Sequence, residues 1–184
     1  QLLRGNRARK VSAESMSAFA SPNYPNLADI GIHIHVHQEY CLPPPTQAFR
    51  LQKLSSHFIA NFRLFPGFSS DVLMFLLTQP VKGLVLETFG AGNAQSNHPP
   101  FLKLLRQASD KGVVMVNCTQ CLHGKVEMSQ YETGVRLQEA GLVSGYDMTP
   151  EAAHCKLLYL LSKYDDVNQV KAQMTLNLRG EMSS

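Results

Sequence analysis

From Phe58 onward, two kinds of hydrophobic pattern follow one another in a regular order. Short, nearly continuous apolar runs such as KGLVLETF are typical of strands that are buried on both faces. Longer amphipathic runs such as PPFLKLLRQASDKG are typical of helices that cover a sheet. The pattern predicts strands at 58–65, 82–89, 113–117 and 142–147, and helices at 69–77, 99–112, 131–141, 149–163 and 167–180.

Signals at the ends of these segments support the assignment. A serine at 69 or 70 is the expected N-cap of one helix, Thr149 and Pro150 begin another, and Gly112 ends a third. Strands that alternate with helices predict an α/β fold, with a four-stranded parallel sheet and helices on both faces. Ligands bind such sheets at the carboxyl ends of the strands, so the candidate loops follow Thr88, Asn117 and Tyr146.

The first 54 residues follow no such order. PNYPN at 22–26 and PPP at 43–45 cannot continue helices or central strands, although IGIHIHVH at 30–37 is a strand candidate. We expect two parts: residues 1–54, the end of a larger unit with a linker, and residues 55–184, the parallel domain. Since the chain begins with Gln rather than Met, we expect a fragment or a processed piece of a longer protein.

Composition narrows the function classes. Hydrophobic residues make up 44% of the chain and charged residues 17%, so a core can form. The net charge is only +3, and four cations lie together in RGNRARK at 4–10. A nucleic-acid binder carries basic residues along a whole face, so no nucleic-acid partner is expected. There is no apolar run of the roughly 18 residues that a membrane span needs, and no signal peptide is visible. Four irregularly spaced cysteines favour a reducing compartment, the cytoplasm.

Three motifs have a chemical and a structural interpretation. GAGN at 90–93 lacks the third glycine of a dinucleotide fingerprint, so a tight turn with positive φ is favoured. Cys118 and Cys121 have CxxC spacing, but no second pair follows, so a loop is favoured over a redox or zinc site. His33, His35 and His37 would lie on one face of a strand and could bind a metal. A solvated strand edge is favoured, and no metal or cofactor is expected.

Longer segments resemble a known family. LETFGAGN, FLKLLRQASDKGVVMVNCTQCLHGKV and LVSGYDMTPEAAHCKLLYLL resemble the C-terminal domain of type I, cytoplasmic L-asparaginases. FRLFPGFSSDV is similar to the first strand and turn of that domain. LLRGNRARKVSAESMSAFASPNYPNLADIGI resembles the end of the N-terminal domain of the same family. The resemblance covers nearly the whole chain and implies the flavodoxin-like, four-stranded fold of that C-terminal domain.

The resemblance also implies an activity. Enzymes of this family hydrolyse L-asparagine to L-aspartate and ammonia through an acyl-enzyme on a Thr nucleophile. The family places that nucleophile in T-G-G-T and a Thr–Asp pair in G-T-D, and neither motif occurs in these 184 residues. The resemblance therefore implies that both lie upstream and that this chain alone is inactive. A lysine that links the second Thr to the Asp follows the Gly of the basic turn by five positions, and Gly5 and Lys10 match. A solvated cation in a basic run is the alternative for Lys10.

Further positions follow from the same resemblance. Asn93 matches a polar residue that approaches the substrate of a neighbouring subunit, which implies a homodimer or a tetramer built as a dimer of dimers. Thr119 and Cys121 match a regulatory asparagine site of some relatives. Glu87 stands where bacterial enzymes carry Arg, and a carboxylate there would repel the carboxylate of the effector.

Two other functions stay open. The LETFG form of the turn resembles animal homologues, which often add ankyrin repeats and some of which are described as lysophospholipases. A non-catalytic interaction module of asparaginase type is the second alternative. An unrelated flavodoxin-like nucleotide or metal binder is not supported by the weak GAGN and CxxC signals.

Overall fold

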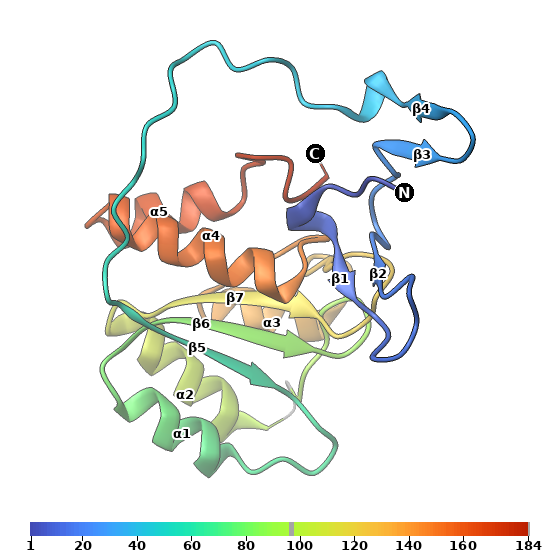
Figure 1. Cartoon of the computed structure of the whole chain (residues 1–184). Coiled ribbons are helices and arrows are strands. Elements are labelled where there is room, and N and C mark those ends of the chain that lie inside the picture. The colour runs from blue at the N-terminus through green and yellow to red at the C-terminus, as the bar shows by residue number, and fades with distance from the viewer. Residues whose placement is uncertain (96–97, 184) are drawn as a thin grey trace.

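The computed structural model describes residues 1–95 and 98–183, and a single four-stranded parallel sheet organises most of them (Figure 1). Its strand order is β5-β6-β7-β8, which confirms the predicted α/β fold class. The four strands are β5 (Phe58–Arg63), β6 (Val81–Thr88), β7 (Val114–Thr119) and β8 (Leu142–Ser144).

Helices cover both faces of this sheet (Figure 1). Three of them pack on one face: α1 (Ser70–Thr78), α2 (Pro99–Asp110) and α3 (Glu132–Glu139). The other face is covered by α4 (Pro150–Lys163) and α5 (Val167–Met174). Side chains along β6 alternate between the two cores: Leu84 and Leu86 enter the first, and Val85 enters the second. This alternation explains why the strand reads as a continuous apolar run.

The predicted helix ends are confirmed where a local signal defines them. The Ser69 side chain accepts a hydrogen bond from the amide of Asp71 at 3.1 Å, so Ser69 is the N-cap of α1. Thr149 does the same for α4, whose first residue is Pro150. Gly112 has φ of 85°, which lets the chain leave α2.

Two expectations are wrong. The proposed strand 30–37 is a hairpin of β3 (Ala28–Ile30) and β4 (Ile34–Val36), because a tight turn, in which the Gly31 amide donates to the His33 carbonyl, reverses the chain. His33 lies in this turn. It and His35 are exposed, in agreement with the expectation that these histidines are solvated. The last helix ends at Met174 rather than Gly180, since tertiary contacts take over the backbone groups beyond it.

The amino-terminal residues form short elements outside the main sheet. After the one-turn helix η1 (Gly5–Arg7), strands β1 (Arg9–Lys10) and β2 (Phe19–Ala20) pair with each other. A second one-turn helix, η2 (Gln38–Tyr40), follows the β3–β4 hairpin. Residues 41–57 contain no helix or strand and lead to β5 (Figure 1). The expected division between residues 54 and 55 falls there and stays a prediction. In the described residues, no helix has the length and apolar character needed to cross a membrane.

Candidate functional site

The candidate site begins at the carboxyl edge of the sheet, where buried polar side chains hold the GAGN turn. Thr88, the last residue of β6, donates a hydrogen bond to the Asn117 side chain at 2.6 Å. The Asn117 amide donates to the Gly92 carbonyl at 3.1 Å. Thr119 at the end of β7 donates to the Gly90 carbonyl at 2.6 Å. Because all three donors are buried, the backbone of the turn is fixed by groups that have no alternative partner in water.

Gly90 and Gly92 give this turn its shape. Their φ angles are 51° and 108°, in the left-handed region that favours glycine. A Cβ on Gly92 would also lie 2.7 Å from a methyl group of Val126. The favoured interpretation of GAGN, a tight turn with positive φ, is therefore confirmed. Residues 96 and 97, between this turn and α2, lie outside the described residues.

Asn93 is the last residue of the GAGN turn, and the oxygen of its side-chain amide accepts a hydrogen bond. Its backbone pairs with Phe89 in both directions, and its side-chain oxygen accepts a hydrogen bond from the Thr133 hydroxyl. Within the described part of the chain, the side-chain nitrogen has no hydrogen-bond partner, and the residue is half-buried. The side chain is thus held by its oxygen and keeps two N–H donors for another molecule.

Lys10 lies in β1, opposite Phe19, and its side chain is exposed. Among residues 1–95 and 98–183, no hydrogen bond or ion pair joins its ammonium to another side chain, so Lys10 and Asn93 are not brought into contact.

The CxxC pair is divided between two environments. Cys118 is completely buried in β7, and burial raises the pKa of its thiol to about 12. Cys121 is exposed in the loop that follows, and both thiols are free. Cys118 therefore lies in a strand and not in the expected loop, which begins after Thr119. A thiol with so high a pKa does not supply the thiolate that redox chemistry needs.

Thr119 and Cys121 are neighbours in space as well as in sequence. The Thr119 hydroxyl accepts a hydrogen bond from the Cys121 amide at 3.0 Å, which shapes the start of the loop. Both residues line a small cavity of about 10 Å³, together with Asp147 and Thr149. This cavity holds no more than a water molecule in the structure as it stands.

Glu87 lies near a larger hollow on the same side of the sheet. The hollow has a volume of about 330 Å³, and Glu87, Asn61, Glu151 and His154 contribute to its lining. One carboxylate oxygen of Glu87 is buried without a hydrogen bond and faces an Arg63 nitrogen at 3.8 Å. Arg9 lines the same hollow and pairs with Glu151, so each of the two carboxylates at this hollow has a cationic neighbour.

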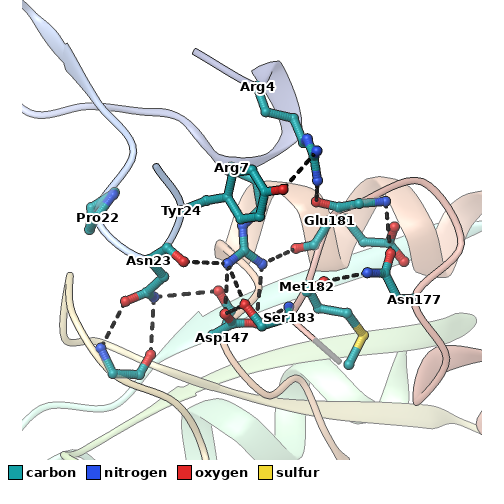
Figure 2. A network of polar contacts seen from close by, with 12 residues as sticks. Arg4, Arg7, Pro22, Asn23, Tyr24, Asp147, Asn177, Glu181, Met182 and Ser183 are labelled. Carbon is teal, nitrogen blue, oxygen red and sulfur yellow. Dashed lines mark hydrogen bonds and ion pairs between the residues drawn. The ribbon is translucent and has the colours of Figure 1, made fainter. Parts of the chain in front are cut away.

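The sequence did not reveal the partners of the basic run. Arg7 is buried and forms a bidentate ion pair with Asp147, with N–O distances of 2.6 and 3.1 Å (Figure 2). Arg9 pairs with the exposed Glu151 at 3.1 Å, and Arg4 donates to the Gly180 carbonyl. All three arginines of the run therefore reach the C-terminal part. No local pattern singled out Asp147.

Burial and ionic contacts oppose each other at Asp147. Burial acts to raise the pKa of its carboxyl, but Arg7 and two hydrogen bonds from Ser183 outweigh burial and hold the pKa below its ordinary value. The carboxylate is therefore charged in the folded protein, and Arg7 is its counter-ion. In the described residues, no group of three histidine, cysteine or carboxylate side chains is placed to hold a metal ion.

This parallel α/β domain with polar loops at its carboxyl edge matches a domain that glutaminases and asparaginases share. The family model of the glutaminase/asparaginase C-terminal domain matches residues 59–174, and that of the asparaginase N-terminal domain matches residues 1–41. The chain belongs to the L-asparaginase family, as the sequence motifs indicated.

Individual relatives agree with this assignment. The chain is 44% identical over its whole length to L-asparaginase 1 of Escherichia coli, of which it covers 54%. It is 40% identical to the 60 kDa lysophospholipase of Mus musculus, of which it covers 32%. The crystal structure of L-asparaginase I from Vibrio cholerae superimposes with a TM-score of 0.92 at 46% identity, over 99% of this chain and 55% of that one. The chain thus spans about half the length of these two L-asparaginases.

Proposed function

We propose that this chain is part of an L-asparagine amidohydrolase, which converts L-asparagine to L-aspartate and ammonia through a Thr acyl-enzyme. The observation that carries the proposal is the similarity to L-asparaginase 1, which covers the whole of this chain at 44% identity. The Thr nucleophile and its Thr–Asp pair belong to the amino-terminal region that relatives have and that these residues do not include.

Lys10 is our candidate for the lysine that transfers the proton in this reaction. A hydroxyl nucleophile needs a base within hydrogen-bond reach, and a lysine can carry a proton between such groups. The exposed Lys10 side chain, without a partner in the described chain, suits a role toward an upstream Thr–Asp pair. An ion pair with the upstream Asp would hold it there.

Asn93 is our candidate for a substrate contact made across a homodimer. Its oxygen is held by Thr133 and its N–H donors are unused in the described residues. Those donors suit a carboxylate or carbonyl oxygen of L-asparagine bound at the neighbouring subunit. Thr119 and Cys121 remain candidates for a regulatory site, but Glu87 makes L-asparagine an unsuitable effector. We also propose a cytoplasmic location, in keeping with the type I resemblance and the four free cysteines.

Ammonia release by the full-length protein tests this function. We expect release with L-asparagine and, in parallel assays, no release of fatty acid from a lysophospholipid. A correctly assembled protein that releases no ammonia would contradict the amidohydrolase and favour the non-catalytic module. Turnover of the lysophospholipid alone would favour the activity for which the mouse relative is named.

Subunit mixing tests the contact across the dimer. We expect Asn93→Ala and Lys10→Met to be nearly inactive separately, because each removes one group from every site. A mixed dimer of the two variants has one intact site, so random reassortment should restore about a quarter of the wild-type activity. Thr133→Val is the milder companion variant, because it removes the hydroxyl that donates to Asn93 but leaves the Asn93 side chain in place. Reassorted dimers that regain no activity would show that Asn93 acts within its own subunit or not at all.

A further inference from the structure

The basic run attaches the amino-terminal segment to the sheet domain through one deeply buried side chain. The guanidinium of Arg7, in η1, donates five hydrogen bonds (Figure 2). Its acceptors are both carboxylate oxygens of Asp147, the carbonyls of Asn23 and Glu181, and the Ser183 hydroxyl. With 2% of the residue exposed, Arg7 has essentially no water to replace any of them.

These acceptors belong to separate parts of the chain. Asp147 lies between β8 and α4, and Glu181 and Ser183 lie in the tail after α5. The tail is itself fastened to Asp147, which accepts hydrogen bonds from the Ser183 amide at 2.8 Å and hydroxyl at 2.6 Å. We call Arg7, Asp147 and Ser183 the arginine latch. A planar guanidinium bound on several edges is fixed in orientation as well as position.

The latch lies close in sequence to Lys10. Lys10 follows Arg7 by three residues, in the two-residue strand β1. That strand pairs with β2 and not with the main sheet, so the sheet does not determine where β1 lies. Side-chain contacts must do so, and the two nearest are those of Arg7 and Arg9.

These two contacts differ in strength. Arg9 pairs with Glu151, whose side chain is 64% exposed, and exposed ion pairs contribute little. Arg7 pairs with a largely buried carboxylate in bidentate geometry, and loss of one partner leaves a buried charge without compensation. Other side-chain contacts also join this segment to the C-terminal part, among them those of Asn6 with Arg179 and of Asn23 with Gly124. Those contacts are exposed, so the latch is the most deeply buried attachment near β1.

We propose that Arg7, held by Asp147 and Ser183, is a positioning residue that places Lys10 for proton transfer. This inference rests on the proposed function, in which Lys10 carries the proton. A displacement of about 1 Å in a reacting group can lower a rate by about 10²-fold. Because Lys10 moves a proton and does not bind substrate, the displacement should lower kcat and leave KM nearly unchanged.

The test is steady-state kinetics of the full-length protein with Arg7→Lys. This variant keeps the positive charge but loses the planar guanidinium that binds both carboxylate oxygens of Asp147. We expect kcat to fall by about 10- to 100-fold, with KM within about twofold of wild type. Active sites are counted by trapping the acyl-enzyme, so that a smaller folded fraction is not mistaken for a slower site. Arg9→Met is the matched control, because Arg9 is adjacent to Lys10 but pairs with the exposed Glu151. Its kcat should stay near that of the wild type. If Arg7→Lys does not fold, Ser183→Ala removes one latch contact and should lower kcat in the same direction.

The outcomes distinguish a failure of the proposed function from a failure of the latch alone. An inactive wild-type protein, or full activity of Lys10→Met, overturns the proposed function and the inference with it. An active wild type that loses activity in Lys10→Met, but keeps kcat per site in Arg7→Lys and Ser183→Ala, overturns the latch alone. Equal losses in Arg7→Lys and Arg9→Met also overturn it, because a general disturbance of β1 would then suffice.

Discussion

Replacement of Lys10 by methionine in the full-length protein is expected to lower kcat for L-asparagine by about 10²- to 10⁴-fold, the range for loss of a positioned proton-transfer group. The physical reason is that a Thr hydroxyl is a weak nucleophile until its proton is removed. Methionine keeps the length of the side chain and removes the ammonium. Since Lys10 is exposed and unpaired within the described residues, its replacement should leave the fold and the oligomer intact. Ammonia release, circular dichroism and size-exclusion chromatography measure these quantities.

Lys82→Met is the matched control for this variant. Lys82 is also an exposed lysine in a strand, near the start of β6 at the opposite end of the sheet from the GAGN turn. Its replacement should not change kcat. Near-normal turnover by Lys10→Met would assign Lys10 to a solvated basic run and would remove it from the mechanism.

Replacement of Glu181 by glutamine is expected to lower the free energy of unfolding by about 3–5 kcal/mol, the range for breaking a buried ion pair. Glu181 and Lys156 are each 5% exposed at the side chain, with the ammonium 2.7 Å from the carboxylate. The ammonium also donates to the carbonyls of Met174 and Leu176, and the carboxylate accepts from the amides of Leu178 and Arg179. Glutamine would leave the lysine charge buried without a counter-ion. Urea unfolding monitored by circular dichroism measures the change.

Two further variants make this prediction specific. The double variant Lys156→Met/Glu181→Gln should lose less stability than Glu181→Gln alone, because no uncompensated charge remains. Glu151→Gln removes a carboxylate from the exposed pair with Arg9 and should change the free energy of unfolding by less than about 1 kcal/mol. A loss of similar size in Glu151→Gln and Glu181→Gln would contradict the argument from burial.

The ion pair of Glu181 and Lys156 also predicts how the stability of the fold depends on pH. Burial acts to raise the pKa of Glu181, but Lys156 and the backbone amides outweigh burial, so the pKa lies below its ordinary value. A carboxyl whose pKa is lower in the folded state stabilises that state above its unfolded pKa, about 4. The stabilisation is lost as the pH falls from there through the lower folded pKa. Glu181→Gln should therefore flatten the acid side of the stability profile.

The sequence alone determined the features that depend on neighbouring residues. Apolar runs and amphipathic runs predicted the strands and helices of the sheet domain, and Thr149 with Pro150 predicted where α4 begins. The glycines of the GAGN turn predicted positive φ. The long motifs predicted the family. Each of these signals is local, because side-chain period, cap geometry and φ preference act over a few residues.

Tertiary structure alone decided which distant groups meet. The pattern of 30–37 fits one strand as well as a hairpin, and only the chain reversal at Gly31 distinguishes them. A last helix could continue to Gly180 by local preference, but the buried Lys156 takes its terminal carbonyls. The partner of Arg7 is 140 residues away, and any of the 14 acidic residues would satisfy the same charge rule. Periodicity carries no information about such long-range pairs, since they are selected by the packing of the whole fold.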